Sequence, residues 1–144
     1  MNFALRKFLF VLCFYTFQTP VLGQENEPLN GEWVVNIDRT IESIRSEYRA
    51  QFDSLPDARR TLIVQSFASR RFEFLQSGRV NVHWVTGQTK KEMTGSWVKD
   101  DDQLEILDEL GKRHLYQVSF LDPNTVVLTL KSNTGLITKL CLNK

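Results

Sequence analysis

The chain has 144 residues, of which 42% are hydrophobic and 24% charged, with 18 basic and 17 acidic side chains. This length suits one domain with a real core. The near balance of charge argues against a nucleic-acid partner, because binding to phosphates needs a basic surface, and against electrostatic attachment to anionic lipid.

The first 23 residues have the three parts of a secretory signal peptide. Arg6 and Lys7 supply a positive start, residues 8–17 are mostly apolar, and residues 21–23 precede an expected cleavage before Gln24. An apolar stretch of about 10 residues is well short of the roughly 20 that cross a bilayer. We therefore expect residues 1–23 to be removed and the protein to be exported, to the periplasm or as a secreted protein, rather than to be an integral membrane protein.

An uncleaved membrane anchor and a lipoprotein are the alternatives for this segment. Lipidation would fall on Cys13, but Leu12 precedes it where a lipoprotein signal has a small residue. Cleavage leaves 121 residues with 16 basic and 17 acidic side chains and a single cysteine, Cys141. No internal disulfide can then form. Cys141 lies in an apolar stretch, so we expect a packed strand residue rather than a reactive thiol.

Residues 24–30 are polar and are expected to form a flexible lead-in to a single domain over residues 31–144. Residues 31–37 alternate in polarity, which predicts the first strand. The apolar spacing then changes to three and four, which predicts a helical hairpin over residues 38–69. Asp38 is the expected N-cap of its first helix, and Ser54 is the expected N-cap of its second.

A period of two returns after residue 71 and predicts seven further strands. Turn signals separate them around residues 76–79, 87, 99–102, 111, 122–124 and 132–135. Successive strands joined by short turns build an antiparallel meander, and eight strands are enough to close it. We predict a mostly β fold, an eight-stranded antiparallel up-and-down barrel with the helical hairpin inserted between strands one and two. An open, strongly curved sheet is the alternative.

Several short motifs along these strands resemble those of the lipocalin-like proteins that Gram-negative bacteria export, especially the Bacteroidota. A Gly-x-Trp pattern opens the first strand at Gly31-Glu-Trp33 and recurs at Gly95-Ser-Trp97. The pattern Phe72-Glu-Phe74 followed by Gly78-Arg-Val80 resembles a hairpin of those proteins, and Leu104-Glu-Ile106 with Tyr116-Gln-Val118 resembles their second half. The resemblance implies a lipocalin or calycin-like barrel that binds a ligand.

This resemblance covers residues 29–142 and has one departure. Lipocalins carry a helix after the barrel, with a basic residue near its end that packs on the signature tryptophan. Here the expected helices lie between strands one and two, and Lys144 follows directly after the last strand. The place of the insert is similar to that of the helical lid of fatty-acid-binding proteins, whose barrels have ten strands.

The inward phase of the strands holds most of the large aromatic side chains. Trp33 and Trp97 are expected to plug the barrel, because a buried indole fills space and its N–H finds a partner. The expected ligand-binding interior consists of Phe72, Phe74, Trp84, Tyr116 and Phe120. The same side chains could instead fill the lumen, since eight strands enclose room for side chains or for one small ligand.

The charged residues give no clear sign of a site. Seven arginines in or beside the insert could draw an anionic group to the barrel mouth, but interleaved acidic residues favour solvated helix faces with local ion pairs. These arginines are Arg39, Arg45, Arg49, Arg59, Arg60, Arg70 and Arg71. His83 and His114 are the only histidines, and residues 100–102 lack the spaced oxygens of a calcium loop, so no metal is expected.

No motif for nucleophilic or metal-dependent catalysis occurs in the sequence, so we expect no catalytic residues and no cofactor. The sequence predicts an exported, non-enzymatic lipocalin-like protein that holds a small hydrophobic or amphipathic ligand in its barrel. The alternative is an envelope interaction module with a filled barrel, which would bind a protein or a polymer through its outer surface.

Overall fold

The computed structural model describes residues 27–132 and 135–144. Within them, eight strands form a closed antiparallel barrel in which each strand pairs with its sequence neighbours and the last pairs with the first. The strands are β1 (Gly31–Val35), β2 (Arg71–Phe74), β3 (Arg79–Thr86), β4 (Thr89–Asp100), β5 (Gln103–Asp108), β6 (Arg113–Asp122), β7 (Thr125–Leu130) and β8 (Lys139–Asn143). The predicted barrel is confirmed, and closure excludes the open sheet. The predicted signal peptide, residues 1–23, lies outside the described residues, as do residues 24–26 of the predicted lead-in.

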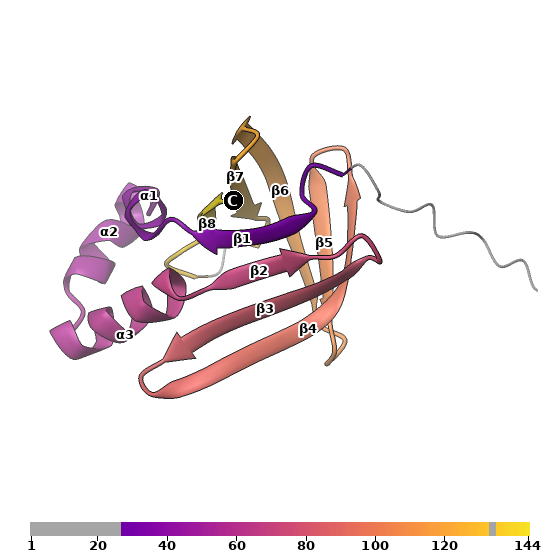
Figure 1. Cartoon of the computed structure of the whole chain (residues 1–144). Helices are drawn as coiled ribbons and strands as arrows, with labels where there is room; N and C mark the ends of the chain where they lie inside the picture. Colours follow the sequence, from indigo (N-terminus) through magenta and orange to yellow (C-terminus); the bar gives the residue numbers. More distant parts are fainter. Residues whose placement is uncertain (1–26, 133–134) are drawn as a thin grey trace, which may run out of the picture.

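Three helices lie between β1 and β2, which confirms the place of the insert. They are α1 (Ile37–Glu42), α2 (Ser46–Asp53) and α3 (Asp57–Ala68). Figure 1 shows the helices gathered at one end of the barrel, while residues 27–30 lead into β1 at the other. We call these the helix end and the plugged end.

The insert contains three helices where two were expected, and both expected N-caps, Asp38 and Ser54, are wrong. Asn36 caps α1, because its side-chain oxygen accepts a hydrogen bond from the Arg39 backbone N–H at 3.1 Å. Helix α1 ends at Glu42, and Arg45 takes an extended conformation before α2 begins. Ser54 ends α2 instead of starting α3, since its hydroxyl donates back to the Gln51 carbonyl at 2.9 Å. Such local side-chain bonds compete with helix continuation.

Helix α1 reinforces the short seam between β1 and β8, where the register has only two residue pairs. Thr40 of α1 is completely buried, and its hydroxyl oxygen accepts a hydrogen bond from the Cys141 backbone N–H at 3.1 Å. The Asn36 N–H donates to the Cys141 carbonyl at 2.8 Å. Burial raises the pKa of the Cys141 thiol, which suits a packed strand residue.

Helix α3 is attached to the β3–β4 hairpin at the helix end. Gln65 donates to the Gly87 carbonyl at 3.0 Å and accepts from the Gly87 N–H at 3.1 Å. The Val85 N–H donates to the Ser69 hydroxyl at 2.9 Å. These bonds fix the end of α3, and hence the residues that follow it, against the barrel wall. None of the helices in the described residues is long and apolar enough to cross a membrane.

The plugged end is filled by large aromatic side chains. The Trp33 indole is completely buried and donates to the Leu29 carbonyl at 2.7 Å. The Trp97 indole donates to the Leu75 carbonyl at 3.1 Å and meets the Phe74 ring edge to face, at 5.3 Å between centroids. Each buried indole N–H therefore has a partner, and little space is left at this end.

Lys144 places a positive charge against the buried ring of Trp33. Its ammonium nitrogen lies 5.1 Å from the centroid of the Trp33 ring, within the range of a cation–π contact. Gly31 lies beneath it with a φ of +114°, and a β-carbon there would approach the Lys144 side chain to 3.3 Å. The first Gly-x-Trp pattern therefore combines a backbone that favours glycine with a capped indole.

In the second Gly-x-Trp pattern, Gly95 is required because the backbone of a neighbouring strand comes very close. A β-carbon at this position would lie 2.4 Å from the Leu107 carbonyl oxygen on β5. The two strands approach too closely for any side chain, because backbone cannot move aside as a flexible side chain can. Glycine at this position therefore sets the packing of β4 on β5 beside the Trp97 plug.

Gly95→Ala is expected to destabilise the barrel by about 1–3 kcal/mol, the usual range for forcing an extra carbon into packed structure. The measurement is the free energy of unfolding from denaturant titration. Ser96→Ala is the matched control, because Ser96 is the exposed neighbour on the outer face of the same strand. Equal stability of the Gly95→Ala variant and the wild type would contradict this account of the β4–β5 packing.

Candidate functional site

A cavity of about 230 Å³ lies inside the barrel toward the helix end. Side chains from the connection between α3 and β2 and from five strands line it. They are Arg70, Phe72, Val82, Trp84, Met93, Ile106, His114 and Tyr116. The strand register explains part of the wall, since Phe72, Val82 and Met93 are paired across β2, β3 and β4.

The structure brings together three of the five aromatic residues expected to contact a ligand. Phe72, Trp84 and Tyr116 line the cavity. Phe74 instead packs against Trp97 at the plugged end, and Phe120 meets Trp33 at 6.2 Å between ring centroids. Alternation correctly placed these rings inside the barrel, but it could not tell which end of the lumen each would occupy.

The wall of the cavity is mainly apolar. Phe72, Val82 and Ile106 belong to the buried core, and Trp84 and Met93 pack against that core while remaining partly accessible. Polar atoms come from Arg70, His114 and Tyr116 and from the indole N–H of Trp84. An apolar hollow with a few polar groups directed into it is the usual composition of a small-molecule site.

Arg70 departs from the expectation that the arginines of the insert form solvated helix faces. It follows α3 directly, and its guanidinium carbon lies 4.5 Å from the centroid of the Phe67 ring and 5.2 Å from that of Trp84. Burial lowers the pKa of Arg70. The Nε–H group is buried, and no described residue accepts a hydrogen bond from it.

Arg70, Met93 and His114 are lining residues that the sequence analysis did not assign to the interior. Each has a signal in the alternation, because Arg70 is in phase with Phe72, Met93 with Trp97 and His114 with Tyr116. For Arg70, the interleaved acidic residues of the insert led us to expect a solvated side chain instead. The phase of its neighbours predicts the inward direction better than its charge does.

Tyr116 and His114 lie two residues apart on β6 and share its inner face. Burial raises the pKa of Tyr116, while the nearby positive charge of Arg70 partly opposes this shift. The Tyr116 hydroxyl is therefore protonated at neutral pH and remains a hydrogen-bond donor. His114 lines the cavity near the β5–β6 turn and is held from behind by Asp108.

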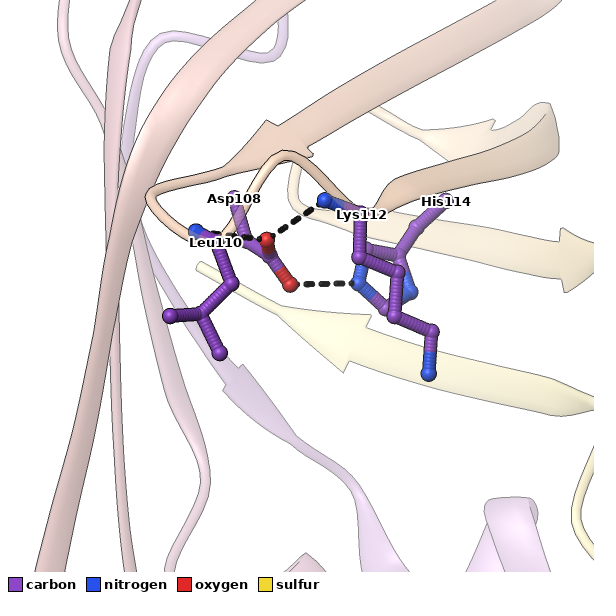
Figure 2. A network of polar contacts seen from close by, with 4 residues as sticks. All are labelled: Asp108, Leu110, Lys112 and His114. Atoms are coloured by element: carbon purple, nitrogen blue, oxygen red, sulfur yellow. Dashed lines mark hydrogen bonds and ion pairs between the residues drawn. The ribbon is translucent and has the colours of Figure 1, made fainter.

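Figure 2 shows how Asp108 holds His114. One carboxylate oxygen of Asp108 accepts from the backbone N–H groups of Lys112 at 2.8 Å and Leu110 at 3.0 Å, and the other lies 3.2 Å from His114 Nε2. The Lys112 N–H, with help from His114 and Leu110, holds the pKa of Asp108 below its ordinary value. An ionised carboxylate only accepts, so the Nε2 atom of His114 donates.

Three further hollows lie on the outer face of the barrel, where charged side chains such as Lys90, Arg113 and Glu105 border them. No group of three or more His, Cys, Asp or Glu side chains capable of holding a metal occurs within residues 27–132 and 135–144. The cavity at the helix end is therefore the candidate site.

Comparisons with protein-family models, with curated proteins and with solved structures found no match to this chain. The class of protein is therefore defined by architecture, as a closed eight-stranded antiparallel barrel compatible with a calycin-like fold. Its role has to be argued from the cavity.

Asp108→Asn is expected to reduce the loss of stability in acid. The folded state lowers the pKa of Asp108 from an ordinary value of 3.8, so its ionised form stabilises the fold above about pH 4. That contribution is lost as the pH falls through the lower folded-state pKa. The measurement is the drop in Tm between pH 7 and pH 3, which should be smaller in the variant than in the wild type.

Asp53→Asn is the control for this comparison, because Asp53 is an exposed residue of α2. Its drop in Tm should match that of the wild type. The same drop in Asp108→Asn as in wild type would show that the Asp108 network does not contribute to acid sensitivity.

Proposed function

We propose that this protein is an exported, non-enzymatic lipocalin-like binding protein that holds one small, largely apolar ligand in the helix-end cavity. The observation that carries the proposal is the cavity itself: an apolar hollow inside a closed barrel, with Arg70, His114 and Tyr116 among its polar groups. The pattern of residues 1–23 supports export. Such a protein stores or carries its ligand and has no need of a reactive group.

The size of the cavity limits the ligand. A dry cavity of about 150 Å³ accommodates benzene, whereas sites for drug-sized molecules measure about 300–1,000 Å³. At about 230 Å³, this cavity suits a molecule of one or two fused rings or a short branched chain. The flat faces of Phe72 and Trp84 favour a planar body.

The alternative is an envelope interaction module that works through its outer surface. Its support is a set of exposed apolar side chains on neighbouring strands, with Val98 60%, Leu107 40% and Leu115 38% exposed. This alternative assumes a filled barrel, however, whereas a cavity of about 230 Å³ lies at the helix end. The cavity therefore favours the binding protein.

The proposal predicts that filling the cavity abolishes uptake of a small ligand. Met93→Trp enlarges an inward side chain of β4 that lines the cavity, and Val98→Trp makes a comparable change on the exposed face of the same strand. Isothermal titration with 2-naphthoate and with 2-naphthamide measures uptake by each protein. We expect one-to-one binding by the wild type and by Val98→Trp, and at least about tenfold weaker binding by Met93→Trp.

Native mass spectrometry of the protein from its envelope fraction complements the titration. A mass matching a chain that begins at Gln24, with a small molecule bound, is the expected result. Undiminished binding by Met93→Trp would place the ligand elsewhere on the protein. A wild type that binds neither probe and carries no additional mass would favour the surface-acting module.

A further inference from the structure

The guanidinium of Arg70 carries a buried hydrogen-bond donor that no side chain of the cavity wall accepts. The contacts that hold this group are with aromatic rings, those of Phe67 and Trp84. Its Nε–H is fully shielded from solvent, without an acceptor among residues 27–132 and 135–144. Removing a charge from water without a partner is costly, and buried arginines are normally paired.

The surroundings hold the guanidinium in place without satisfying its donors. Phe67 and Trp84 offer ring faces at 4.5 and 5.2 Å, and the carboxyl end of α3 presents the negative end of a helix dipole. The backbone of Arg70 is fixed too, since its N–H donates to Phe67 and its carbonyl accepts from Val35. Neither ring faces nor a dipole can accept hydrogen bonds in the guanidinium plane.

The cavity also lacks an anion of its own among the described residues. Its remaining polar groups are Tyr116, which keeps its proton, His114, and the indole of Trp84, which can only donate. The nearby carboxylate of Asp108 is engaged by two backbone N–H groups and by His114. Aromatic rings hold this positive charge in an apolar hollow with no negative group beside it. Such a charge is suited to bind an anionic group of a ligand.

We propose, building on the function above, that the ligand is a small monocarboxylate whose carboxylate pairs with Arg70 while its apolar body occupies the cavity. The planar guanidinium fork matches the two oxygens of a carboxylate. A single unpaired cation balances one negative charge, so a dianion such as a phosphate monoester would retain an excess charge in a poorly solvated space.

The test compares 2-naphthoate with its neutral analogue of the same shape, 2-naphthamide, by isothermal titration of the full chain. Wild type should bind the carboxylate about ten- to a hundredfold more tightly, the usual gain from hydrogen bonds to charged groups. Arg70→Gln should remove this preference and keep the weaker binding of the amide. Arg71→Gln is the matched control, because Arg71 is the next residue, points outward and pairs with Glu32 at 2.8 Å.

Circular dichroism shows whether Arg70→Gln folds, and Arg70→Lys is a second variant that tests the proposal if it does not. Arg70→Lys keeps the charge but loses the planar fork, so it should show a reduced preference for the carboxylate. Equal affinity of the wild type for the two probes would overturn the carboxylate assignment and leave the binding function standing. Binding of neither probe would overturn both. A preference that persists in Arg70→Gln would assign the carboxylate to another residue.

Discussion

The limited lumen of an eight-stranded barrel is the constraint from which the rest of this structure follows. Such a barrel holds roughly what its own side chains fill, so the distribution of bulk along its axis decides where space remains. Trp33, Trp97 and Phe74 gather at one end, where hydrogen bonds and edge-to-face contacts fix them. At the other end, smaller residues such as Val82 and Ile106 share the wall, and a cavity remains.

The helical insert gives this cavity its electrostatic character. Hydrogen bonds from Gln65 and Ser69 attach α3 to the β3–β4 hairpin, and the chain then enters β2 through Arg70. The short connection places a guanidinium at the mouth of an apolar hollow, where low polarity strengthens its attraction for an anion. The helices therefore do more than cover the barrel end: they position the group that we propose recognises the ligand.

The sequence predicts this fold well and the site only in part. Strict alternation and six turn signals define the strand count, because a sheet with one buried face imposes a period of two. Helix boundaries were less predictable, since a single bond from Asn36 competes with the cap expected from Asp38. Alternation places Phe74 and Trp84 on the same inner face, but their separation along the axis depends on register and shear. Alternation indicates that Arg70 points inward, but the lack of an acceptor at its Nε–H depends on which side chains pack around it in the folded barrel.

The NMR signal of the Arg70 Nε–Hε group is the most direct test of the central claim, that this guanidinium recognises a carboxylate in the cavity. Its assignment follows from its loss in Arg70→Lys. On addition of 2-naphthoate, the account predicts a downfield shift of the Hε resonance and slower exchange with water, because a buried donor gains a charged acceptor. An unchanged signal in protein saturated with 2-naphthoate would contradict it.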